Sequence, residues 1–170
     1  MTTSKYLDQR VGVFVDVQNL YYSARSLYNA RVNFANVLKE AVGDRKLVRA
    51  IAYVIRASIP EEKSFFTALE KSGYEVKTKD LQIFPGGAKK GDWDVGITMD
   101  MVQTMSKLDV LIIVSGDGDY VDAVNFLKAH GNRVEALAFG RSTSAKLKDA
   151  VDDFIDLDES PRKYLFPMRR

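Results

Sequence analysis

The chain has 170 residues, of which 46% are hydrophobic and 28% are charged, and its formal net charge at pH 7 is +2. These values are typical of one globular domain and exclude the disordered and fibrous classes of protein. No apolar run approaches the ~20 residues of a membrane span and the N-terminus lacks a signal-peptide core, so we expect a soluble, cytoplasmic protein without membrane contacts.

The counts of cysteine and histidine restrict the metal chemistry that the chain can perform. There is no cysteine and one histidine, His130, which excludes disulfides, thiolate sites and zinc sites built from several imidazoles. Any metal site must therefore use oxygen ligands, which favours hard cations such as Mg²⁺ or Mn²⁺.

Short apolar runs alternate with helical patterns along the whole chain, which predicts an α/β domain with a mostly parallel sheet. In chain order we expect a strand at 11–17, helices at 19–27 and 34–42, a strand at 47–55, a helix at 60–72, a strand at 74–81, a loop at 85–91, a helix at 94–105, a strand at 110–114, a helix at 120–130, a strand at 133–139, a helix at 144–150 and a last strand at 154–157.

The two most apolar strands, Val11–Val15 and Val110–Val114, are expected to be central and adjacent, because strands buried on both faces read as continuous β-branched runs. The carboxyl ends of parallel strands lie on one edge of a sheet, and α/β proteins bind ligands there. We therefore look for the functional site at the residues that follow these two strands.

Aspartates follow both central strands. Asp16 ends the first, and Ser-Gly-Asp-Gly-Asp, with Asp117 and Asp119, follows the second. Neighbouring strands are ~4.8 Å apart, so Asp16 and Asp117 are predicted to project into one crevice. Asp94 opens a helix after the glycine-rich loop and reaches the same edge. These four aspartates are the candidate metal ligands and catalytic groups.

Electrostatic repulsion is the reason to expect a cation among these aspartates. Two carboxylates ~5 Å apart at an effective dielectric constant of ~20 repel by about 3 kcal/mol, so the group needs a proton or a divalent cation to be stable. Gly116 and Gly118 are expected to let backbone and side chains approach such an ion. The alternative is that individual aspartates only cap helices, a role that fits Asp119 and Asp122.

Other side chains are candidates for supporting roles. Asn19 follows Asp16 by three residues and is predicted to cap a helix or to orient Asp16 or a phosphate. Ser115 is predicted to cap the turn or to hold the metal ligands in place through hydrogen bonds. Trp93 is expected to pack against the domain. The weaker metal-ligand candidates are Asp92, Asp100 and Asp122, and the candidates for binding phosphates are Arg56, Lys89, Lys90 and Arg141.

Three segments resemble the NYN domains of the PIN-like nuclease superfamily, in particular the LabA-like group. These segments are FVDVQNL at 14–20, KKGDWDVGITMD at 89–100 and SGDGDYVDAVNFLKAHGNRVEAL at 115–137. The resemblance implies a single-domain, Rossmann-like three-layer α/β/α sandwich over 1–157, followed by a basic tail at 158–170. The sequence departs from the family's pattern at two positions. Gln18 stands where many relatives have glycine followed by glutamate or serine, and Tyr120 stands where they usually have phenylalanine.

The resemblance also implies an activity, the divalent-metal-dependent hydrolysis of phosphodiester bonds, chiefly of RNA. The matched positions are Asp16, Asn19, Asp94, Asp117 and Asp119. We therefore expect a ribonuclease that uses Mg²⁺ or Mn²⁺ and acts on RNA or another single-stranded nucleic acid.

Two other functions remain as alternatives. The first is a non-catalytic RNA-binding or scaffolding module on the same fold. The second is a haloacid-dehalogenase-type phosphatase, which GDGDYVD at 116–122 favours but which Gln18, at the place of the general acid/base, opposes. The tail is expected to dock on the domain, to pair two protomers as a homodimer, or to contact nucleic acid.

Overall fold

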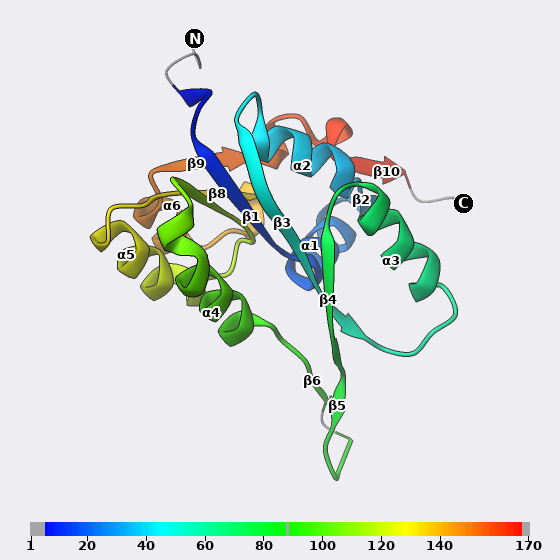
Figure 1. Cartoon of the computed structure of the whole chain (residues 1–170). Helices are drawn as coiled ribbons and strands as arrows, with labels where there is room; N and C mark the ends of the chain where they lie inside the picture. The colour runs from blue at the N-terminus through cyan, green and yellow to red at the C-terminus, as the bar shows by residue number, and fades with distance from the viewer. Residues whose placement is uncertain (1–5, 88, 168–170) are drawn as a thin grey trace.

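The structure, a computed structural model, describes residues 6–87 and 89–167, with the side chains of 89, 90 and 167 left out. Its centre is a six-stranded sheet in the order β4-β3-β1-β7-β8-β9, in which every neighbouring pair is parallel (Figure 1). The strands are β1 (Arg10–Asp16), β3 (Lys46–Arg56), β4 (Glu75–Asp80), β7 (Val110–Val114), β8 (Arg133–Ala138) and β9 (Asp153–Asp156). The predicted α/β class and mostly parallel sheet are confirmed.

The two most apolar strands lie side by side at the middle of the sheet, as the sequence predicts. Val13 of β1 is paired with Ile112 of β7, and Phe14 is paired with Ile113. All five residues of β7 are buried, because helices cover both of its faces. The carboxyl ends of β1 and β7 therefore lie next to each other on one edge.

Six helices form the two outer layers. One layer contains α1 (Val17–Tyr28), α2 (Phe34–Val42) and α3 (Glu62–Lys71), and the other contains α4 (Asp94–Thr104), α5 (Val121–Ala129) and α6 (Ala145–Ala150). Alternate residues of β1 enter the two cores, since Val13 and Val15 pack with the first layer and Phe14 packs with the second. No helix in the described part of the chain is long and apolar enough to cross a membrane.

The C-terminal segment docks on the domain, one of the three roles expected for it. Strand β10 (Leu165–Pro167) pairs antiparallel with β2 (Ala30–Val32), a short strand that the sequence analysis missed. Tyr164 is 4% exposed and packs in the first core, and its hydroxyl donates to Glu40 Oε1 over 3.0 Å. The apolar residues of the tail thus cover part of the first layer.

The glycine-rich segment is a hairpin and not only a loop. Strand β5 (Gln82–Ile83) pairs antiparallel with β6 (Lys89–Lys90), so the prediction of a loop was wrong at the second strand. The hairpin projects from the body of the domain and leads into α4 (Figure 1). Gly86 and Gly87 have φ values of 97° and 89°, which only glycine adopts readily at the tip.

Candidate metal centre

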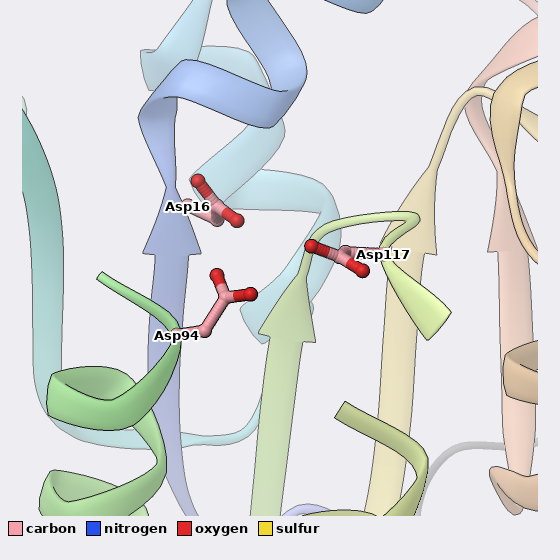
Figure 2. A group of neighbouring side chains, drawn as sticks. All are labelled: Asp16, Asp94 and Asp117. Carbon is pink, nitrogen blue, oxygen red and sulfur yellow. The ribbon is translucent and has the colours of Figure 1, made fainter. Parts of the chain in front are cut away.

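Three aspartates converge at the carboxyl ends of β1 and β7. Asp16 is the last residue of β1, Asp94 is the first residue of α4, and Asp117 follows β7. Each offers a carboxylate oxygen, and these oxygens lie within 4.8 Å of one another. Figure 2 shows the three side chains pointing toward one another from three separate elements. The predicted convergence of Asp16, Asp94 and Asp117 is therefore present in the structure.

Asp16 is the most firmly held of the three. It is 8% exposed and is the N-cap of α1, because its Oδ1 accepts a hydrogen bond from the backbone N–H of Asn19 over 3.2 Å. Its Oδ2 accepts hydrogen bonds from Ser115 Oγ over 3.3 Å and from the Tyr120 hydroxyl over 3.2 Å. Donors from the first turn of α1, from the residue directly after β7 and from the turn that follows it thus fix the orientation of this carboxylate.

Asn19 and Ser115 connect the two central strands. The side-chain Oδ1 of Asn19 accepts the backbone N–H of Gly116 over 2.9 Å, and Ser115 Oγ accepts the backbone N–H of Asp117 over 3.1 Å. The cap of the helix is Asp16 itself, so the prediction that Asn19 is the cap was wrong. The side-chain amide of Asn19 instead binds the turn after β7, and this contact places Asp117 relative to Asp16.

Asp94 is positioned by the packing of the residue before it. The indole Nε1 of Trp93 donates to the carbonyl oxygen of Val54 over 2.9 Å, and its ring lies 5.2 Å from that of Tyr53. A Cβ atom on Gly96 would lie 2.5 Å from the Trp93 ring, so only glycine lets α4 begin this close to the indole. Trp93 packs against the domain, as predicted, and brings Asp94 to the sheet edge.

Burial and mutual repulsion disfavour the charged forms of two of these carboxyl groups. Burial, followed by the charge of Asp117, raises the pKa of Asp94 to about 7. Burial also raises the pKa of Asp16 above its ordinary value. Among the described side chains, no lysine or arginine forms an ion pair with Asp16, Asp94 or Asp117. The repulsion within the cluster is therefore left for a proton or a cation to relieve.

The donor set fits a hard divalent cation. All three groups offer carboxylate oxygens, which are the ligands that Mg²⁺ and Mn²⁺ prefer over nitrogen or sulfur. Oxygens within 4.8 Å of one another can reach a common ion from different sides. Asp16, Asp94 and Asp117 are thus the residues that could hold the metal.

Tyr120 is the residue of this site that the sequence analysis missed. Its side chain is 0% exposed, and its hydroxyl lies 3.2 Å from Asp16 Oδ2 and 3.1 Å from Asp94 Oδ1. The one signal in the sequence was the tyrosine itself, which stands where the resemblance expects phenylalanine. The contacts of its hydroxyl require the end of β1 and the start of α4 to lie beside the turn after β7, and no local sequence pattern predicts that arrangement.

The structure does not bring Asp119 to the three-carboxylate cluster. Asp119 lies in the 3-10 turn η3 (Gly118–Tyr120), and its side chain is exposed. Its backbone N–H donates to Asp117 Oδ1 over 2.9 Å, so the turn geometry directs the backbone, and not the carboxylate, toward the site. The prediction of four converging aspartates is corrected to three.

The weaker candidates also lie outside the cluster. Asp100 accepts hydrogen bonds from the Tyr53 hydroxyl over 2.7 Å and from Lys77 Nζ over 2.8 Å, so its charge is compensated. Asp92 is exposed and accepts the backbone N–H of Asp94 over 3.3 Å. Asp122 is exposed in the first turn of α5.

Both arginines predicted to bind phosphates are engaged with carboxylates. Arg56, at the carboxyl end of β3, pairs with Asp80 over 2.9 Å, and Arg141, just after β8, pairs with Asp158 over 3.5 Å. The side chains of Arg56 and Arg141 are 47% and 59% exposed, so each also contacts solvent. The predicted roles of the Lys89 and Lys90 side chains lie outside the described residues.

The glycines around Asp117 serve a different purpose from the one expected. A Cβ atom on Gly116 would lie 2.7 Å from Thr143 Oγ1 and 3.0 Å from the carbonyl oxygen of Ser142, and one on Gly118 would lie 2.7 Å from Ser144 Oγ. These glycines let the turn after β7 pack against residues 142–144. This close contact accounts for the absence of a side chain at both positions.

Comparisons with known proteins agree with the motifs. The model of the NYN domain family matches residues 10–158. The chain is 26% identical over 161 residues to "Low amplitude and bright protein LabA" of Synechococcus elongatus, covering 88% of this chain and 84% of that protein. It also superposes on the crystal structure of a protein of unknown function from Vibrio parahaemolyticus with a TM-score of 0.85 and 32% identity, covering 94% of this chain and 97% of that one. Because the family model spans most of the sequence and the predicted motifs lie within it, the chain belongs to the NYN domain family.

Proposed function

We propose that this protein is a divalent-metal-dependent ribonuclease that hydrolyses phosphodiester bonds of single-stranded RNA. The observation that carries the proposal is the convergence of Asp16, Asp94 and Asp117 without a compensating cation among the described side chains. Membership of the NYN domain family adds support, since the resemblance implies nuclease chemistry. The single histidine of the chain is at a helix end, so carboxylates are the groups available for this reaction.

The mechanism assigns distinct tasks to the residues of the centre. Asp16, Asp94 and Asp117 would hold Mg²⁺ or Mn²⁺, which polarises a phosphodiester and lowers the pKa of an attacking water. Asn19 and Ser115 keep Asp16 and Asp117 in register through their contacts with the turn after β7. Hydrogen-bonded partners of this kind typically change metal affinity or activity by about 10–100-fold when they are removed.

The RNA backbone is proposed to lie across the same edge of the sheet. Arg56 ends β3 and Arg141 follows β8, on either side of the central pair, and both side chains are partly exposed. Lys89 and Lys90 precede Asp94 in the sequence and are proposed to contact phosphates as well. Asp119 is proposed to face the solvent side of the centre, without direct contact with the ion.

The test is cleavage of end-labelled single-stranded RNA by the full chain in Mg²⁺, in Mn²⁺ and in a chelator. We expect cleavage only with metal, and its loss in Asp16→Asn and Asp117→Asn, with Asp122→Asn as the exposed control that keeps the wild-type rate. Circular dichroism checks that each variant is folded. Cleavage at the wild-type rate in Asp16→Asn or Asp117→Asn would refute the assignment.

The same experiment separates the ribonuclease from an RNA-binding module. A module without catalysis would bind the labelled RNA, leave it intact in both metals, and melt at the same temperature with and without Mn²⁺. A labelled single-stranded DNA of the same sequence decides whether the ribose is required.

A further inference from the structure

We propose that Tyr120 is a positioning residue of the metal centre, whose hydroxyl holds the Asp94 carboxylate next to Asp16. This inference rests on the proposed function and adds a residue to it. The hydroxyl lies 3.1 Å from Asp94 Oδ1 and 3.2 Å from Asp16 Oδ2, so one oxygen atom touches two of the three candidate ligands.

The ring of Tyr120 is fixed by the core. It is 0% exposed and packs in the hydrophobic cluster that the second helical layer forms with the sheet, together with Ile97 of α4 and Val124 of α5. Its backbone belongs to the turn between β7 and α5. A fully buried aromatic ring in a close-packed core has little freedom, so the position of the hydroxyl is set by the fold.

Asp94 depends on this hydroxyl more than Asp16 does. The Tyr120 hydroxyl has one proton, which Asp16 and Asp94 share, and Asp16 has two further donors in the backbone N–H of Asn19 and Ser115 Oγ. Within the described residues, the Tyr120 hydroxyl is the one hydrogen-bond donor recorded for the Asp94 carboxylate. Asp94 is also partly exposed, so its side chain has solvent into which it can turn.

Repulsion supplies the force that Tyr120 opposes. Oxygens of Asp16, Asp94 and Asp117 lie within 4.8 Å of one another, so in their charged forms the groups repel. Without the hydroxyl, Asp94 can relieve this repulsion by turning toward solvent, which separates it from the other two ligands. Removing the oxygen of Tyr120 should therefore weaken metal binding even though the ring still fills the core.

The test is the affinity of the full chain for Mn²⁺, measured from the free-ion signal in electron paramagnetic resonance. Tyr120→Phe removes one oxygen and keeps the ring. Tyr53→Phe is the matched control, because Tyr53 is 1% exposed, belongs to the same cluster, and donates over 2.7 Å to Asp100, which lies outside the centre. The melting temperature without metal is recorded for both variants, so that lost affinity is not confused with lost stability.

We expect Tyr120→Phe to bind Mn²⁺ about 10-fold more weakly or worse, and Tyr53→Phe to bind like the wild type. The inference is overturned if Tyr120→Phe binds Mn²⁺ within twofold of the wild type, or if both variants lose affinity equally. A wild-type protein that binds no Mn²⁺ overturns the proposed function and this inference with it, whereas a wild type that binds and a Tyr120→Phe variant that binds equally overturn the inference alone.

Discussion

The side-chain Oδ1 of Asn19 accepts the backbone N–H of Gly116 over 2.9 Å, although the two residues are 97 positions apart in the chain. Asn19 lies in the first turn of α1, three residues after Asp16, and Gly116 directly precedes Asp117. The parallel pairing of β1 with β7 holds their ends side by side, and this hydrogen bond ties the first turn of α1 to the turn after β7, from which Asp117 projects.

Asn19→Ala should lower stability. The substitution leaves the buried N–H of Gly116 without its acceptor, which costs about 1–3 kcal/mol. Urea denaturation followed by circular dichroism measures the loss. Asn125→Ala, on the exposed face of α5, is the control and should stay within about 0.5 kcal/mol of the wild type. Equal midpoints for Asn19→Ala and the wild type would show that this hydrogen bond does not hold the site.

The stability of the metal-free protein should depend on pH through Asp94. Its pKa is raised from 3.8 to about 7 in the folded state, so between these values the folded chain holds a proton that the unfolded chain releases. The contribution of this bound proton to the free energy of unfolding is fully present below pH 3.8, and it is lost as the pH rises through about 7. Melting temperatures in a chelator should therefore fall between pH 5 and pH 8, in part from this group.

Asp94→Asn is the matching variant for this dependence. Asparagine stays neutral, so the fall in melting temperature between pH 5 and pH 8 should become smaller, and the variant should exceed the wild type in metal-free stability at pH 8. Mn²⁺ should raise the melting temperature of the wild type at pH 8 and have little effect on the variant. An unchanged pH dependence in Asp94→Asn would contradict the assignment of the raised pKa to this residue.

Glu135 should be important for stability and not for metal binding. It is 4% exposed and accepts hydrogen bonds from Arg45 over 2.9 Å and from Arg133 over 2.8 Å. Glu135→Ala removes the carboxylate that pairs with both guanidiniums, which should lower the free energy of unfolding in urea by about 3 kcal/mol. Mn²⁺ affinity should be unchanged where the variant is folded. A large fall in affinity would show that the ion pairs and the metal centre are coupled.

Much of the fold could be predicted from the sequence because its signals are local. Two β-branched runs predicted the central strands, and their order in the sheet followed from burial on both faces. Since parallel strands end on one edge, the order of residues along the chain was enough to place together the aspartates that follow them. Asp16 and Asp117 were found in this way, and Asp94 was found from its place at the start of a helix after the glycine-rich loop; these are the three carboxylates that converge in the structure.

Tertiary structure decided how the carboxylates are held and which of them belong to the site. Tyr120 is 104 residues from Asp16, and the 3.2 Å contact between its hydroxyl and Asp16 Oδ2 exists only once the turn after β7 has packed beside the end of β1. Asp119 follows Asp117 by two residues, yet the tight turn directs its carboxylate to solvent. The docking of Tyr164 beside Glu40 likewise joins segments with no common pattern. Residue type and spacing specify helices, strands and their ends, whereas a side-chain hydrogen bond exists only once packing has fixed both partners.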